Sequence, residues 1–157
     1  MNEWLQRMEA AANDVFASML GVQIGQADFD SVSGSVDLTA LVSLTGTPEG
    51  LLEISCHTAS AARLAMLMLG SDGPESDDYA KDALGEICNM VAGGIKSRSS
   101  SSEDRCRLSV PAVISGKDYT VRTLKATDRH KLCLAFEGRP LQITLELYRG
   151  SQLEAGI

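Results

Sequence analysis

The sequence of 157 residues has no cluster of basic residues. Its 14 Lys and Arg residues are outnumbered by 21 Asp and Glu residues, which gives a formal net charge of −7. Nucleic acids and anionic membranes are bound through positive surfaces, so we expect neither of them as a partner. A neutral or basic protein surface is easier to accommodate.

The sequence also lacks a long apolar run. No stretch approaches the roughly 18 apolar residues of a membrane span. The segment Met1–Arg7 offers no cationic lead-in to an apolar stretch, as a signal peptide would. We therefore expect a cytoplasmic protein.

No pair of cysteines has the close spacing of a zinc or redox motif. The four cysteines are widely separated: Cys56, Cys88, Cys106 and Cys133. We interpret them as buried free thiols, the ordinary state of isolated cysteines in a core.

The hydrophobic content of 44% is enough for one core in a chain of this length. We therefore predict a single domain over residues 1–157. Apolar residues recur at helical spacing over residues 3–20, and Gly21 follows as a C-terminal cap. A shorter helix is predicted over residues 59–69, with Thr58 as its N-cap and Gly70 at its end.

The rest of the chain shows one further helix and several segments of period two. The helix is predicted over residues 77–98, and the strands over 22–29, 35–44, 51–57, 105–114, 118–125, 131–137 and 141–148. One-sided strands indicate an α+β fold in which two long helices and a shorter one cover an antiparallel sheet. The two halves share a helix-then-strands layout, which suggests a structural duplication.

The helix over residues 77–98 has two contrasting faces. At about 100 degrees per residue, five apolar side chains form one stripe. They are Leu84, Ile87, Cys88, Val91 and Ile95. The opposite face carries Asp82, Glu86, Asn89 and Gly93, spaced so that all four lie on one side of the helix. A carboxylate, a carboxamide and a bare backbone position are thus presented together to solvent.

Such a face can be an ordinary solvated surface, because most exposed helix charges have no specific role. The consecutive glycines Gly93 and Gly94 favour another interpretation. Each costs a helix about 1 kcal/mol relative to alanine, and such a cost usually reflects close approach by another backbone or a partner.

The segment Asp82–Gly94 resembles the signature of the CheC, CheX and FliY phosphatases of bacterial chemotaxis. That signature is an acidic or serine residue, three residues, Glu, two residues, Asn, and a proline a little over twenty residues later. Pro111 follows Asn89 by 22 positions, since 111 minus 89 is 22. CheC proteins carry the signature on both long helices, whereas Glu9 and Asn13 of the first helix are four apart rather than three. The resemblance therefore favours the CheX branch, with a single site.

The resemblance implies a phosphatase that removes the phosphoryl group from the aspartate of a CheY-like response regulator. Asn89 would orient the attacking water, and Glu86 would contact the regulator's active-site lysine. Asp82, Gly93 and Pro111 would belong to the binding surface, with Asp82 serving for capping or orientation. Mg²⁺ would reside on the regulator, so this chain would need no cofactor or metal of its own.

The resemblance also implies a homodimer, and we predict that the strand 141–148 offers the exposed edge for pairing. Two alternatives to the enzyme stay open. One is a catalytically inactive adaptor that binds a regulator or a flagellar-switch component. The other is a purely structural dimerisation module, which the exposed polar face disfavours.

Three weaker patterns do not enter the interpretation. Acidic residues at 72–78 resemble a metal site, but acids are also favoured before a helix N-terminus. The stretch Gly93–Ser97 lacks the Gly-Lys-Ser adjacency of a phosphate loop. His57 and His130 have no recognisable catalytic partners in the sequence.

Overall fold

The structure, a computed structural model, describes residues 2–28, 36–73, 76–99, 105–124 and 126–148. Its helices are α1 (Glu3–Val15), which continues as the π-helical turn η1 (Phe16–Leu20), α2 (Thr58–Leu69) and α3 (Asp77–Ser99). Its strands are β1 (Gly25–Gln26), β2 (Leu38–Gly46), β3 (Gly50–Cys56), β4 (Cys106–Leu108), β5 (Ala112–Ser115), β6 (Ala126–Phe136) and β7 (Arg139–Tyr148). The predicted α+β class is confirmed.

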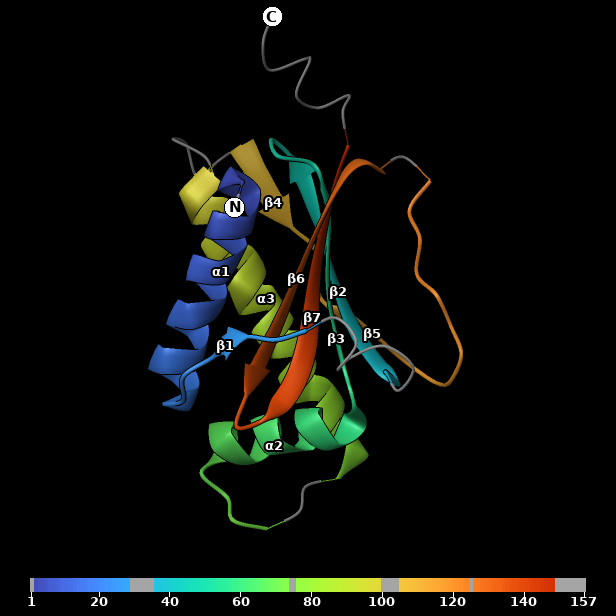
Figure 1. Cartoon of the computed structure of the whole chain (residues 1–157). Helices are drawn as coiled ribbons and strands as arrows, with labels where there is room; N and C mark the ends of the chain where they lie inside the picture. The colour runs from blue at the N-terminus through green and yellow to red at the C-terminus, as the bar shows by residue number, and fades with distance from the viewer. Residues whose placement is uncertain (1, 29–35, 74–75, 100–104, 125, 149–157) are drawn as a thin grey trace, which may run out of the picture.

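The seven strands form one antiparallel sheet in the order β1-β6-β7-β3-β2-β4, with β5 also paired to β2. Helices α1 and α3 lie along the same face of this sheet, and α2 packs against α3 at one end of it (Figure 1). The two long helices and the shorter one therefore have the predicted arrangement.

The two halves of the chain are related in layout and interleaved in the sheet. Each half contributes a hairpin, β2–β3 or β6–β7, and the hairpins meet where β3 pairs with β7. The outer neighbour of each hairpin comes from the other half: β1 pairs with β6, while β4 and β5 pair with β2. This arrangement agrees with the predicted duplication.

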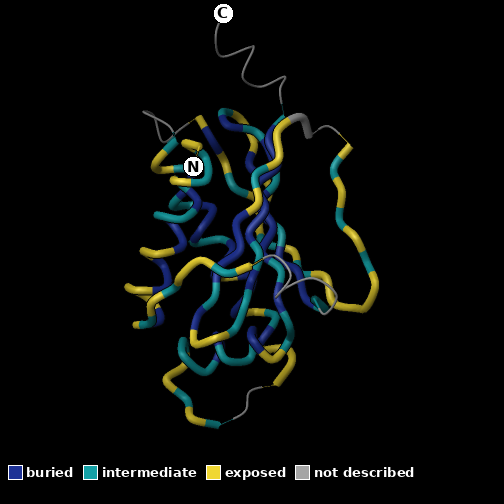
Figure 2. The backbone as a smooth tube through the Cα atoms, viewed as in Figure 1, coloured by how far each residue is buried: buried dark blue, intermediate teal, exposed yellow. Residues whose placement is uncertain are grey.

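The core lies between the helices and the sheet, where the buried backbone is concentrated (Figure 2). Alternate residues of β2, β3 and β7 point into it, as the period of two requires. Phe16 and Phe136 lie in contact there, with ring centroids 5.4 Å apart. The four cysteines are free thiols and buried, as predicted.

Three predicted strands differ from the observed ones. Only Gly25–Gln26 of the segment 22–29 is a strand among its described residues. The segment 105–114 divides into β4 and β5, because Ser109–Pro111 interrupts the ladder and proline has no N–H to donate to it. The described part of 118–125 is not a strand but an irregular connection, in which the Tyr119 hydroxyl lies 2.7 Å from Thr39 Oγ1.

Two further predictions are wrong. Strand 141–148 is no edge, because β7 is hydrogen-bonded to β6 on one side and to β3 on the other. Thr58 is not the N-cap of α2, because His57 holds that position. Thr58 instead donates its backbone N–H to Asp37 Oδ1 at 2.7 Å. A carboxylate distant in sequence thus satisfies the first turn of the helix.

Within the described residues, no helix combines the length and the apolar content that a membrane crossing demands.

Candidate functional site

The middle of α3 presents the predicted polar face to solvent. The five residues of the apolar stripe, Leu84, Ile87, Cys88, Val91 and Ile95, are completely buried. On the other side of the helix, Asp82 and Glu86 are exposed, and Asn89 and Gly93 are partly exposed. Glu86 and Asn89 are three residues apart and therefore project from adjacent turns on one side.

Pro111 packs against the same helix at Gly85, the residue before Glu86 in the sequence. A Cβ atom at Gly85 would lie 3.6 Å from Pro111 Cβ and 3.5 Å from Val113 Cγ2. The approach to Pro111 is fixed by two hydrogen bonds of 2.9 Å, which join Ser109 to the backbone N–H and carbonyl of Ser43. The structure thus places Pro111 against α3 at Gly85, although the two residues are far apart in the sequence.

Gly85 was missed by the sequence analysis. It is buried where α3 meets the Pro111 segment, with little space for a longer side chain. The available signal was a glycine inside a predicted helix, directly before the signature glutamate. Its small size allows Pro111 to lie close to the polar face.

The polar groups of this face are not engaged by the fold. Among the described residues, none forms a side-chain hydrogen bond or an ion pair with Asp82, Glu86 or Asn89. Their donors and acceptors are therefore available to a docked molecule. Removing these side chains should cost the fold little.

The paired glycines have separate environments. A Cβ at Gly93 would meet nothing within 4 Å, so this position is open on the polar face. A Cβ at Gly94 would lie 2.9 Å from Ala11 Cβ, so this glycine permits the close approach of α1 and α3. Only Gly93 fits the interpretation of a contact surface for a partner.

The first helix does not repeat the arrangement. Glu9 accepts a hydrogen bond of 3.4 Å from Gln26 Nε2 and so belongs to the contact between α1 and β1. Asn13 is exposed one turn later. The spacing of four and the engaged carboxylate both differ from the α3 site, which agrees with a single site.

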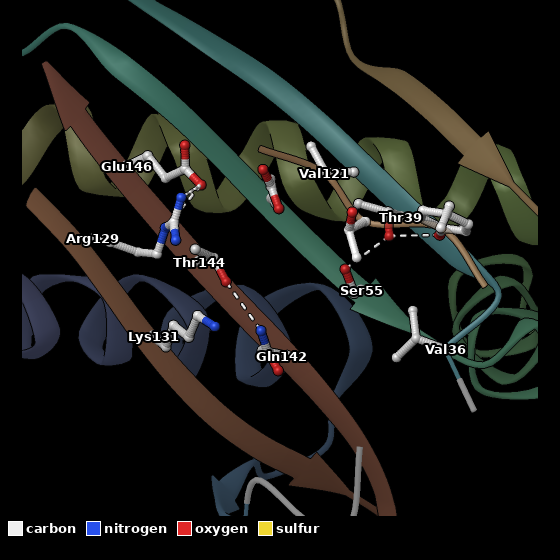
Figure 3. Close-up of a pocket in the computed structure, with 12 residues that line it drawn as sticks. Val36, Thr39, Ser55, Val121, Arg129, Lys131, Gln142, Thr144 and Glu146 are labelled. Atoms are coloured by element: carbon white, nitrogen blue, oxygen red, sulfur yellow. Dashed lines mark hydrogen bonds and ion pairs between the residues drawn. The ribbon is translucent and has the colours of Figure 1, made fainter. Parts of the chain in front are cut away.

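A polar cavity of about 230 Å³ lies on the opposite face of the sheet from α3. Its walls come from β2, β3, β6 and β7 and from residues 119–121 (Figure 3). In the cavity, the Thr39 hydroxyl is hydrogen-bonded to the hydroxyls of Ser55 and Tyr119, and the Gln142 carboxamide is hydrogen-bonded to the Thr144 hydroxyl. The irregular connection that contains Tyr119 covers this polar face of β7.

Two glutamates are buried in this cavity. Glu146, 1% exposed, accepts bonds from Arg129 Nε at 3.1 Å and from the Thr123 hydroxyl. Glu53 is 8% exposed, and its Oε1 has no hydrogen-bond partner among the described residues. Burial, and to a lesser degree the Glu146 carboxylate, raise the pKa of Glu53 to about 7, although the charges of Arg129 and Lys131 act to lower it.

Glu53 should make the free energy of unfolding depend on pH. The pKa of Glu53 in the folded chain is about 7, above the ordinary value of 4.5. Between pH 4.5 and pH 7 the folded state therefore binds more protons than the unfolded state. The free energy of unfolding should fall as pH rises through this range. Glu53→Gln should reduce the loss of stability between about pH 5 and pH 8 by roughly 2 kcal/mol. Urea denaturation of both chains across this range measures it, and identical pH profiles would contradict it.

The acidic residues at 72–78 do not form a metal site among the residues described. No group of three or more His, Cys, Asp or Glu side chains gathers there closely enough to hold an ion. Glu75 lies outside the described residues. Asp77 and Asp78 stand in the first turn of α3, where acids favour a helix start.

The sheet and the helices together form an α+β protein with a CheC-like fold. The profile of the family described as chemotaxis phosphatase CheX matches residues 38–137. The chain therefore belongs to the CheX family. The match spans the strands from β2 to β6 and the whole of α2 and α3, but not β7.

A curated relative, the CheY-P phosphatase CheX of Thermotoga maritima, is 28% identical over 87 residues. The matched region is 55% of this chain and 56% of that protein, so the chain spans just over half the length of this relative. The identity supports a common family.

Solved structures show the same fold over nearly the whole chain. The chemotaxis protein CheX of Vibrio vulnificus superposes with a TM-score of 0.77 at 22% identity, covering 93% of this chain and 97% of that one. The CheX of Borrelia burgdorferi, solved as a complex with CheY, BeF3 and Mg²⁺, gives 0.70 at 18% identity, with 94% and 99% covered. The structural likeness thus extends beyond the part that the sequence comparisons match.

Proposed function

We propose that this chain, as a single domain over residues 1–157, is a hydrolase that dephosphorylates a CheY-like response regulator. The observation that carries the proposal is the solvent-facing pair Glu86 and Asn89 on α3, in a helix against which Pro111 packs at Gly85. The pair lies in a chain of the CheX family, and its polar groups are unused by the fold.

The proposed chemistry needs positioning rather than a nucleophilic side chain. The phospho-aspartate of a regulator is an acyl phosphate, and a water oxygen attacks its phosphorus while the bond to the aspartate oxygen breaks. The products are inorganic phosphate and the free aspartate. The carboxamide of Asn89 can both accept from and donate to one water, which suits it to orient the attacking molecule.

Glu86 supplies the docking contact in this proposal. Its carboxylate is exposed one turn from Asn89 and suits an ammonium group such as the regulator's active-site lysine. Asp82, Gly93 and Pro111 complete the docking surface. Mg²⁺ is bound by the regulator, and we assign no metal or cofactor to this chain, which we place in the cytoplasm.

The direct test is the decay of a phosphorylated CheY-like regulator in the presence of the purified chain and Mg²⁺. We expect catalytic amounts of the chain to shorten the lifetime of the phosphorylated regulator. Binding without acceleration across a panel of regulators would instead favour the catalytically inactive adaptor. The unengaged carboxamide of Asn89 favours the enzyme, since an adaptor has no need of it.

Gly93→Leu should weaken the binding of the regulator about tenfold or more, because the new side chain would stand in open space between α3 and a docked partner. The same change should leave the chain equally or slightly more stable, since leucine favours helix over glycine. Binding titration and thermal unfolding on one sample measure both effects. Gly93→Ala is the matched control, as it raises helix propensity while adding one methyl group. Unchanged affinity in Gly93→Leu would place the partner elsewhere.

We also propose that the chain forms a homodimer, as its family resemblance suggests. Because β7 is internal, the pairing surface must differ from the strand predicted first. The described sheet offers β1 at one side and β4 and β5 at the other. Sedimentation at micromolar concentration should give twice the mass of one chain, and a single species of monomer mass would contradict the proposal.

A further inference from the structure

The polar cavity on the far face of the sheet has no role in the proposed dephosphorylation. We propose that it binds a small organic cation, a molecule with protonated amino or guanidino groups, whose charge is held by the carboxylate of Glu53. Glu53 points into the cavity from β3, whereas its neighbours Leu52 and Ile54 point toward the helices. The site is therefore separated from the docking face by the thickness of the sheet.

Glu53 is buried, and one of its carboxylate oxygens has no hydrogen-bond partner among the described residues. Its side chain is more than nine-tenths buried, with 8% exposed, and Oε1 makes no hydrogen bond to any described residue. Buried carboxylates without a partner are unfavourable and rare in folded proteins. The register partners of Glu53 are Leu41 on β2 and Thr144 on β7, and neither carries a charge that could neutralise the carboxylate.

The basic residues that line the cavity do not form an ion pair with Glu53. Arg129 is committed to Glu146, with 3.0 Å between Nη2 and Oε1. Lys131 lies in the same cross-strand row as Glu53, but Thr144 of β7 stands between them, so their backbones are about 10 Å apart. No basic group of the described chain comes within 4 Å of the Glu53 carboxylate. A ligand cation would occupy that place.

The remaining walls define the size and character of the ligand. Five hydroxyl-bearing residues and one carboxamide line the space: Thr39, Ser55, Tyr119, Thr120, Thr144 and Gln142. A volume of about 230 Å³ is below the usual range of pockets for drug-sized molecules, so the ligand is small. The combination suits a short amine or guanidine that also donates hydrogen bonds to neutral oxygens.

Binding of a cation requires the ionised form of Glu53, so affinity should rise with pH. The titratable and charged groups that face Glu53 are Glu146, Arg129, Lys131 and Tyr119. With the pKa of Glu53 at about 7, the ionised fraction rises about 30-fold from pH 5.5 to pH 8.5. Putrescine and agmatine stay protonated over this range, so their affinity should follow the state of Glu53.

The test is calorimetric titration of the whole chain with putrescine and with agmatine in phosphate buffer, alongside uncharged 1,4-butanediol. We expect saturable binding of at least one amine, a rise in affinity of about 30-fold over this pH range, and no binding of the diol. Glu53→Gln should weaken the amine at least tenfold, while Asp78→Asn, which removes an exposed carboxylate outside the cavity, should not.

Thermal unfolding first establishes that each variant is folded. If Glu53→Gln fails to fold, Ser55→Leu serves instead, because it fills the cavity and keeps the carboxylate. Absence of saturable amine binding to the wild-type chain overturns the proposal. So does equal binding of the diol, affinity that is independent of pH, or undiminished binding to a folded cavity variant. None of these readouts depends on phosphatase activity.

Discussion

An Asn89→Ala variant should dephosphorylate its regulator about 100-fold more slowly than the wild-type chain, a loss typical of removing one positioned polar group from a reaction centre. The expectation rests on the proposal that catalysis here consists of placing a water in line with phosphorus. Alanine cannot orient that water. The fold should survive, because Asn89 lies opposite the buried stripe and forms no side-chain bond among the described residues.

The measurement is the rate of phosphate release at saturating regulator, corrected for the regulator's own hydrolysis. Affinity for the regulator should change less than the rate, because the docking contact of Glu86 remains. Ser97→Ala, an exposed position nearer the end of α3, serves as the matched control. An Asn89→Ala chain that keeps the wild-type rate would remove water positioning by this residue from the mechanism.

A Gly94→Leu variant should lose about 3 kcal/mol in free energy of unfolding, since overpacking a tight contact is costly. A Cβ at this position would lie 2.9 Å from Ala11 Cβ, 3.4 Å from Ala11 Cα and 3.2 Å from Arg98 Nη1. The Ala11 atoms are close to the backbone of α1 and cannot swing aside. The two long helices would have to separate.

Gly93→Leu is the matched comparison, because the same substitution one residue earlier meets open space. Urea denaturation should therefore separate two neighbours in one helix, with only Gly94→Leu destabilised. A compensating pair, Gly94→Ala with Ala11→Gly, should recover part of the stability that Gly94→Ala alone loses. Equal effects of leucine at both positions would contradict the assigned helix contact.

The α3 face was predictable from sequence because every feature of it is local. The apolar stripe and the positions of Glu86 and Asn89 depend only on the helical period. The closeness of Pro111 to the helix required knowledge of tertiary structure, and only the family resemblance suggested it. The separate roles of Gly93 and Gly94 depend on where α1 lies, which the helical period does not specify.

Strand order was the main feature that sequence pattern did not provide. The alternation in β7 correctly predicted which residues face the core, but not which strands are its neighbours. Alternation does not show what lies against the polar side of the same strand. The irregular connection after β5 covers it, so Thr144 and Glu146 are buried despite a pattern typical of a solvated face.

The cap of α2 illustrates the same limit at a smaller scale. Thr58 satisfies the sequence preference for an N-cap. Asp37, the residue before β2, nevertheless accepts hydrogen bonds from both the backbone N–H and the hydroxyl of Thr58. The two residues are brought together only when β2 and β3 pair. Local preference therefore identified the beginning of the helix but not the group that stabilises it.

The exchange of outer strands between the two halves affects when the chain can acquire its fold during synthesis. Gly25 of β1 pairs with Ala135 of β6, so β1 cannot pair until about 110 further residues have been made. The β2–β3 hairpin likewise lacks its neighbour on either side until β4, β5 and β7 have been made. Pairings between residues so distant in sequence form slowly, and unpaired strands are prone to aggregate. The nascent chain should therefore depend on chaperones until β7 has left the ribosome.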